Sequence, residues 1–283
     1  AALSAGESGA WTLSSGTNNT VVFNNPSSST STFTGSYGGT YVLQWALTSG
    51  GCTGTDQMTV TFNQPSDAAI SALVGTGDLF WCGLTNTDWS TATNWYQKQA
   101  TGHYVRMSNS IPGLGNEVFT VSTANAGICV GNNTPTLSVN SNAEDLYVGV
   151  GVTLNLSNDS MNIAQNLINQ GTIVASTGTV NFTGSTNSII SGFGNTQLFN
   201  MRVNKSAGAT LTLQQPVLVT NNLNMVQGNV FTSSTNLLTL GSTSSAPGSL
   251  TYNAGTIVGP FKRYFANAAS AGTAGLFPVG TAV

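Results

Sequence analysis

Short β-forming segments recur at a nearly constant spacing through the second half of this 283-residue chain, and this regularity restricts its possible folds. From Leu137 to Leu237 an apolar position returns about once every eight residues, each followed by Gly, Asn or Ser, with no helical pattern between. Such short, regular strands are typical of a β-solenoid, a sandwich or a barrel. The recurring positions are Leu137, Leu146, Val152, Met161, Leu167, Ile173, Val180, Ile189, Phe199, Thr210, Val217, Leu223, Val230 and Leu237.

Similar sequence segments recur within this region and favour the solenoid. Residues 167–173, 176–182 and 223–230 each place a short apolar stretch next to Asn, Gln or Gly. In a parallel coil, inward side chains stack from turn to turn, while Asn or Gly at the corners takes unusual backbone angles and extends hydrogen-bonded ladders. Three strands per turn predict turns of about 25 residues and roughly five turns, stacked at the ~4.8 Å strand spacing.

The first segment, residues 1–66, has the pattern of a separate β-sandwich module. Tyr41, Leu43, Trp45 and Leu47 alternate so that one sheet face can be buried. Clusters of Ser, Gly, Asn and Pro separate the predicted strands. A break at Gln64–Asp67 predicts a domain boundary, with residues 67–77 as a connector. The predicted strands are Trp11–Leu13, Thr20–Phe23, Ser31–Thr34, Thr40–Leu47 and Gln57–Phe62.

Residues 78–136 contain three of the five tryptophans: Trp81, Trp89 and Trp95. Their density predicts a packed cap at the start of a β-helical domain covering residues 78–283. The alternative is a sugar-stacking platform, because a flat indole face complements the apolar face of a pyranose.

The low charge of the chain excludes several classes of protein. Only 5% of residues are charged, with 9 acids and 6 bases, against about 25% in ordinary domains. Binding even six phosphates would use every base, so no nucleic-acid partner is expected. A coiled coil is excluded because it needs far more Glu and Lys. No apolar run reaches the roughly 18 residues of a membrane span, so no membrane insertion is expected. The bases are Lys98, Arg106, Arg202, Lys205, Lys262 and Arg263.

Few residues are suited to catalysis or metal binding. His103 is the single histidine, lies in a predicted loop, and is not expected to be catalytic. Glu144 and Asp145 are adjacent, and in a strand they would point to opposite faces, so they are poor catalytic partners. No enzyme activity and no cofactor are therefore expected. No calcium-loop motif is present, although scattered Asp and Asn oxygens leave a structural Ca²⁺ open.

The three cysteines leave two alternatives. Cys82 and Cys129 flank the Trp-rich segment and are candidates for a disulfide in an oxidising compartment, with Cys52 unpaired. Three buried free thiols are the alternative.

The chain also resembles a known group of proteins in two places. Its first segment resembles the PKD/Ig-like repeats of very large surface proteins of Bacteroidota-type bacteria, through residues 9–16, 25–35, 39–45, 51–52 and 58–62. The remainder resembles the Trp-opened β-helical repeats of the same giant proteins, through residues 88–95, 111–112, 117–121 and 277–281. In such repeats the cysteine matching Cys52 has an upstream partner, which is missing here, so the module looks truncated at its start. Cys82 and Cys129 depart from the usual pattern, which favours a local disulfide.

This resemblance implies an all-β segment cut from a longer extracellular, cell-surface polypeptide that is exported by the type IX route. The leading hypothesis is a non-catalytic, stiff stalk or filament segment of a surface adhesin. Its low charge and flat Thr/Asn-rich faces would let copies associate laterally into a multi-chain fibre. The alternative is a carbohydrate-binding module that uses Trp81, Trp89 or Trp95 to contact surface glycans.

Overall fold

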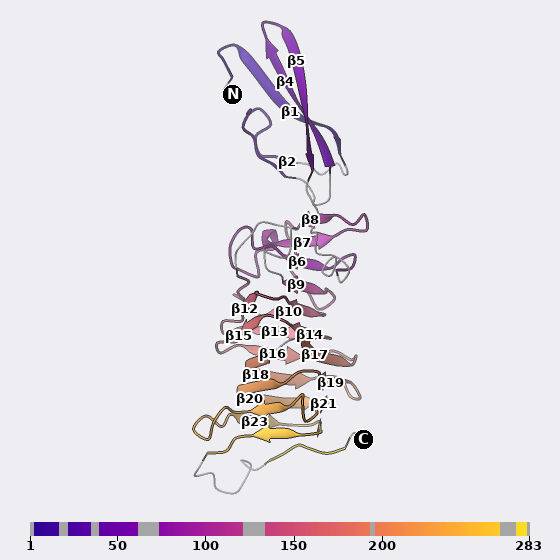
Figure 1. Cartoon of the computed structure of the whole chain (residues 1–283), viewed down its shortest axis with the longest axis vertical. Coiled ribbons are helices and arrows are strands. Elements are labelled where there is room, and N and C mark those ends of the chain that lie inside the picture. Colours follow the sequence, from indigo (N-terminus) through magenta and orange to yellow (C-terminus); the bar gives the residue numbers. More distant parts are fainter. Residues whose placement is uncertain are drawn as a thin grey trace.

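The computed structural model describes residues 3–16, 22–34, 40–61, 74–120, 134–192, 196–266 and 276–281. The protein is all-β, with 51% of the described residues in strands. One 3₁₀ turn, η1 (Ala92–Asn94), is the sole helical element within these ranges. Figure 1 shows an antiparallel sheet at the N-terminal end, followed by a long stack of coils built from short strands. The described segments contain no helix that is long and apolar enough to cross a membrane.

The N-terminal sheet has the order β1-β4-β5 and is antiparallel throughout. Its strands occur where the alternation predicted them, at β1 (Glu7–Gly16), β4 (Thr40–Ser49) and β5 (Cys52–Thr61). A separate short ladder pairs β2 (Val22–Phe23) with β3 (Phe33–Thr34). Tyr41 and Leu43 are buried on the predicted face. The predicted boundary and most of the connector, residues 62–73, lie outside the described residues.

The following domain is a parallel β-solenoid of about six turns. Its strands form three faces, which we number 1 to 3. Face 1 contains β6 (Leu79–Trp81), β9 (Val118–Thr120), β11 (Leu146–Val148), β14 (Leu167–Asn169), β17 (Ser188–Gly192), β19 (Thr210–Leu213), β21 (Asn229–Phe231) and β24 (Ile257–Val258). Face 2 contains β12 (Thr153–Asn155), β15 (Thr172–Val174), the first halves of β18 (Thr196–Asn204) and β20 (Val217–Gln227), β22 (Leu238–Leu240) and β25 (Phe261–Arg263). Face 3 contains β10 (Ser141–Ala143), β13 (Ser160–Ile163), β16 (Thr179–Phe182), the second halves of β18 and β20, and β23 (Ser249–Tyr252).

Three strands per turn and turns of about 25 residues were predicted. On face 1 the paired residues of successive turns are 19 residues apart at Leu211 and Val230, 23 at Leu167 and Ile190, and 28 at Val118 and Leu146. The predicted length lies within this range, and the different lengths of the corner loops account for the spread.

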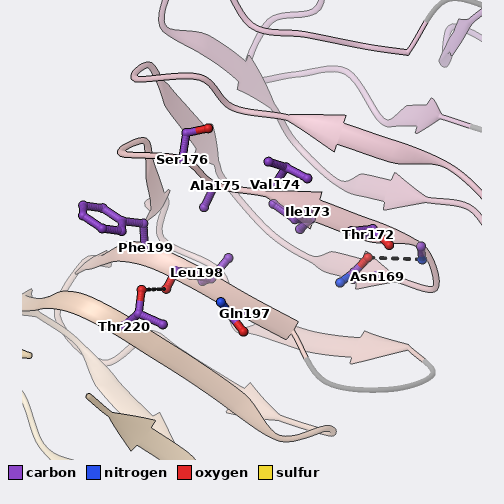
Figure 2. Close-up of a pocket in the computed structure, with 11 residues that line it drawn as sticks. Asn169, Thr172, Ile173, Val174, Ala175, Ser176, Gln197, Leu198, Phe199 and Thr220 are labelled. Carbon is purple, nitrogen blue, oxygen red and sulfur yellow. Dashed lines mark hydrogen bonds between the residues drawn. The ribbon is translucent and has the colours of Figure 1, made fainter. Parts of the chain in front are cut away.

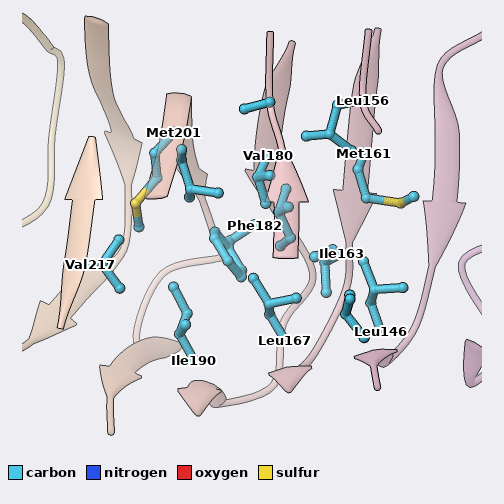
Figure 3. Packing of buried hydrophobic residues seen from close by; sticks show 14 of the residues in the cluster. Leu146, Leu156, Met161, Ile163, Leu167, Val180, Phe182, Ile190, Met201 and Val217 are labelled. Atoms are coloured by element: carbon cyan, nitrogen blue, oxygen red, sulfur yellow. The ribbon is translucent and has the colours of Figure 1, made fainter. Parts of the chain in front are cut away.

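The solenoid interior is built from inward side chains that stack in columns (Figure 3). On face 1, Leu146 pairs with Leu167 and Leu167 pairs with Ile190, and none is more than 1% exposed. On face 3, Met161 pairs with Val180, and Val180 with Met201. Each buried side chain of this size contributes roughly 1.5–3 kcal/mol, so the stacked columns supply the main stabilisation of the solenoid.

Glycine is required at some corners. Gly228 and Gly255 have φ values of +97° and +91°, and a Cβ at Gly255 would collide with the carbonyl oxygen of Gly228 in the turn above. A side chain there would be opposed by both the backbone conformation and the close approach of successive turns.

The predicted cap closes the N-terminal end of the solenoid. β6 continues face 1 by pairing in parallel with β9, but on its other side it pairs antiparallel with β7 (Trp95–Lys98). β7 in turn pairs antiparallel with β8 (Tyr104–Arg106). The hairpin replaces the next parallel turn and covers the edge that β6 would otherwise expose.

Candidate functional site

The three cap tryptophans lie in the interior. Trp89 and Trp95 are fully buried, and Trp81 is 3% exposed. Their rings contact one another with centroid distances of 4.6 to 6.2 Å, and the Trp95 indole N–H donates to the Trp89 carbonyl oxygen at 2.8 Å. The alternative of a glycan-stacking surface at Trp81, Trp89 and Trp95 is therefore wrong, because no ring face is left for a sugar. The packed cap is the correct interpretation.

Asn94 positions the loop that carries Trp89, and sequence reasoning did not select it. It is fully buried, accepts from the Thr85 N–H at 2.8 Å, and donates to the Asn86 side chain at 2.8 Å and the Asp88 carbonyl at 2.9 Å. A buried amide with this many bonds fixes the path of the surrounding loop. The one feature of the sequence that could have pointed to Asn94 is its position directly before Trp95.

The cysteines differ in their environment. Cys82 is buried and disulfide-bonded, whereas Cys52 is free and exposed. Three buried free thiols are thus ruled out. Cys129, the predicted partner of Cys82, lies outside the described residues, so this pairing stays a prediction.

Three carboxyl groups occupy equivalent positions on successive turns beside the cap. Asp78, Glu117 and Asp145 each directly precede a strand of face 1, and the strands that follow them are paired in register. Asp78 is 9% exposed, accepts from the Gly75 backbone N–H, and shares a side-chain hydrogen bond with Glu117. Sequence reasoning could not find this stack, because the spacing between its members depends on loops of very different length.

The stacking changes the protonation of these groups. Burial, and then the charges of Asp78 and Asp145, raise the pKa of Glu117 to about 7. Burial also raises the pKa of Asp78, and burial and Asp78 together raise the pKa of the Tyr104 hydroxyl to about 12. A hydrogen bond between two carboxyl groups needs a proton on one of them, so Asp78 and Glu117 form a proton-sharing pair within the stack.

Glu144 and Asp145 lie outside the strands, so the expectation that strand geometry would direct them to opposite faces does not apply. They occupy the corner between β10 and β11, where the Glu144 carboxylate accepts from the Gln165 amide and Asp145 accepts from the Asn166 backbone N–H at 2.7 Å. Both carboxylates thereby link their own turn to the next one. His103 lies in the loop between β7 and β8, as predicted.

One lysine lies inside the solenoid. The Lys205 side chain is 1% exposed, and its ammonium donates to the carbonyls of Ala164 and Thr183 at 3.1 and 2.5 Å and to the Ser188 hydroxyl at 2.6 Å. These three acceptors lie on preceding turns, so Lys205 links the turns at one corner. Burial lowers its pKa to about 8, because the charged form loses its hydration.

Amides form a ladder along the outside of face 3. Asn162 donates to Asn142 at 2.9 Å, Asn181 donates to Asn162 at 2.8 Å, and Arg202 donates to Asn181 at 3.2 Å. The four residues are paired in register on β10, β13, β16 and β18. An Asn ladder was expected at the corners, whereas this one runs along a sheet face, where alternation directs the side chains outward. Face 3 thus presents a regular column of amides with one cation.

Face 2 contains a break. β15 pairs with β12 but not with the next strand, β18, although both belong to the same face. A groove of about 400 Å³ lies at this break, lined by Asn169, Thr172, Val174, Gln197 and Phe199, among others (Figure 2). Among the lining residues, Asn169 is buried and donates to the Thr196 hydroxyl at 3.0 Å.

No cluster of three or more His, Cys, Asp or Glu residues within the described ranges could hold a metal ion. The structural Ca²⁺ that the sequence left open has no such cluster to bind within these ranges. Comparisons with protein-family models, with curated proteins and with solved structures found no match to this chain.

Proposed function

We propose that this chain is a non-catalytic, stiff segment of a very large extracellular surface adhesin or filament. The observation that carries the proposal is the solenoid itself, in which successive turns are joined by parallel ladders on faces 1 and 3, by ladders on either side of the break in face 2, and by stacked core side chains. Bending such a stack at one turn would break backbone hydrogen bonds and open the core together. Stiffness along the axis is the mechanical property that a stalk needs.

The proposal includes the type of modules and the location. We take the N-terminal sheet as a PKD/Ig-like module and the solenoid as the β-helical repeats of giant surface proteins, exported by the type IX route. The disulfide at Cys82 supports an extracellular location, because such bonds persist in oxidising compartments.

Other copies of this chain are the proposed partners, in a multi-chain fibre. Face 3 supports this role, because its outward positions are amides and hydroxyls with Arg202 as the cation among them. A second column, which contains Thr179, Asn200 and Asn222, runs beside the amide ladder. Two such faces can approach without strong charge repulsion and exchange side-chain hydrogen bonds.

The test combines shape and assembly. Electron microscopy of the whole chain should show rods, and sedimentation velocity should show a mass that rises with concentration. The Asn162→Lys/Asn222→Lys double variant adds two charges to face 3 and should remain monomeric. The matched control, Thr153→Lys/Thr239→Lys, adds the same charge to face 2 and should assemble like the wild type. Compact flexible particles, or monomer at every concentration, would overturn the proposal.

A further inference from the structure

A groove of about 490 Å³ lies on one face of the N-terminal sheet, within the usual size range of ligand sites. Two indoles, Trp11 and Trp45, form part of its wall, together with Leu47, Met58 and two carboxylates. Trp11 and Trp45 are directly paired across β1 and β4, with ring centroids 5.1 Å apart. Unlike the cap tryptophans, both are only partly buried.

The backbone around these indoles is adapted to them. A Cβ at Gly9 would collide with the Trp45 ring, so this glycine lets the indole lie directly against β1. The rings continue in a row from Trp11. The Trp11 and Phe23 ring centroids are 6.5 Å apart, and those of Phe23 and Phe33 are 5.7 Å apart. The short β2–β3 ladder carries Phe23 and Phe33, and Phe33 in turn contacts the Tyr41 ring at a centroid distance of 5.5 Å. The indole end of this aromatic row borders the groove.

The groove is acidic, and no base lies near it in sequence. Asp56 faces Trp45 across β4 and β5, and Glu7 lies on β1. The Asp56 carboxylate accepts one backbone N–H at 2.9 Å and the Glu7 carboxylate one at 2.8 Å, which fixes their orientation and leaves further acceptor positions. Every Lys and Arg of the chain lies at residue 98 or beyond, so residues 1–66 carry none.

From this arrangement we propose that the groove binds a neutral saccharide. The indole faces stack on the apolar face of a pyranose ring, and Asp56 and Glu7 accept hydrogen bonds from its hydroxyls. Anionic sugars are repelled, because the carboxylates have no neighbouring cation. A peptide strand would instead add to an exposed sheet edge, whereas this groove lies on the sheet face. The inference goes beyond the proposed rod function and does not depend on it.

The experiment titrates the whole chain with neutral trisaccharides of glucose, N-acetylglucosamine and mannose, and with a trigalacturonate as the anionic comparison. Binding is measured by calorimetry and by indole fluorescence, to which Trp11 and Trp45 are the responsive groups because the cap indoles are buried. We expect at least one neutral sugar to bind in the micromolar to millimolar range and to alter the fluorescence. The anionic sugar should bind at least tenfold more weakly.

Three variants locate the site. Trp45→Ala should weaken binding at least tenfold, and Asp56→Asn, which keeps the oxygen that accepts the Gln57 N–H, should weaken it several-fold without unfolding the sheet. Tyr252→Ala removes an exposed aromatic ring from the solenoid and should leave the affinity unchanged. The proposal is overturned if no neutral sugar binds, if Asp56→Asn binds like the wild type, or if peptides compete for the site. None of these readouts depends on rod shape or assembly, so this inference and the rod proposal can fail separately.

Discussion

At the residue scale, Lys205 shows how a charged side chain becomes part of a packed interior. Its ammonium is bonded to oxygens of two preceding turns, which compensates part of the cost of removing the charge from water. The remaining cost appears as the lowered pKa. Because the folded and unfolded chains then bind protons differently, the residue makes the stability of the solenoid depend on pH.

The pH dependence follows from the sign of this shift. The pKa of Lys205 falls from 10.5 to about 8 on folding, so between these values the unfolded chain binds more protons. The free energy of unfolding should therefore rise between pH 8 and 10.5, by roughly 3 kcal/mol at about 1.4 kcal/mol per pKa unit. The free energy of unfolding of Lys205→Met, measured by urea denaturation, should not rise over this pH range. The exposed control Lys262→Met should show the same rise as the wild type. Equal pH slopes in both variants would contradict the assignment.

Glu117 gives a pH dependence of the opposite sense. Its pKa is raised from 4.5 to about 7, so between these values the unfolded chain releases a proton that the folded chain keeps. Cap stability should therefore fall as the pH rises from 4.5 to 7 and stay low above it. Glu117→Gln should remove this fall and slow hydrogen exchange in β6 and β9 at pH 8. Asp159→Asn, which lies away from the stack, is the control and should keep the fall in stability. If the stability of Glu117→Gln falls between pH 4.5 and 7 as much as that of the wild type, the shared proton is the wrong explanation.

At the element scale, the amide ladder joins successive strands of face 3 through side chains as well as backbone. Asn162 donates to Asn142 in the turn before it and accepts from Asn181 in the turn after it, so it takes part in two bonds of the ladder. Ladders of this kind depend on register, because a shift of one residue would turn the amides inward.

Asn162→Ala tests the ladder at its centre. The substitution removes both hydrogen bonds and leaves Asn142 and Asn181 without this partner, at an expected cost of about 1–2 kcal/mol. Asn158→Ala, in the exposed turn before β13, should cost much less. Guanidinium denaturation of the two variants provides the comparison, and similar midpoints would mean that water replaces the ladder bonds fully.

A matched pair of glycines separates backbone strain from collision between turns. Gly255 and Gly208 have φ values of +91° and +84°, but a Cβ would collide with a neighbouring turn only at Gly255. Gly208→Ala should therefore cost about 1 kcal/mol from strain alone, and Gly255→Ala clearly more. Thermal unfolding of both variants measures the difference. Equal losses of stability in the two variants would show that the corner at Gly255 relaxes to accept the methyl group.

At the scale of the whole molecule, the strands of each turn pair only with those of adjacent turns, so stability is distributed along the axis. The central strands have neighbours on both sides, whereas β23 pairs with β20 and has mostly exposed side chains. Unfolding should begin where a turn lacks one neighbour.

Hydrogen exchange checks this gradient. Amides of β16 and the second half of β18 should exchange slowest, and those of β23 should exchange at least tenfold faster. Sub-denaturing urea should accelerate β23 first. Exchange at one common rate throughout the solenoid would instead indicate a single cooperative unit, and the nearest-neighbour description would then be wrong.

The sequence by itself determined the local part of this structure. Period-two alternation and regularly spaced turn residues determined the all-β class, the strand positions in the N-terminal sheet, the three-strand turn and the Trp-rich cap, because these depend on neighbours along the chain.

Only the tertiary structure decided which distant residues meet. The length of the turns varies from 19 residues at Leu211 and Val230 to 28 at Val118 and Leu146, because the corner loops differ in length. The Asp78–Glu117–Asp145 stack and the Lys205 bonds join residues separated by loops of variable length, and no local pattern records that separation. The exposure of indoles was decided in the same way. Trp81, Trp89 and Trp95 pack against one another, while Trp11 and Trp45 line an open groove, because burial depends on what folds over a side chain.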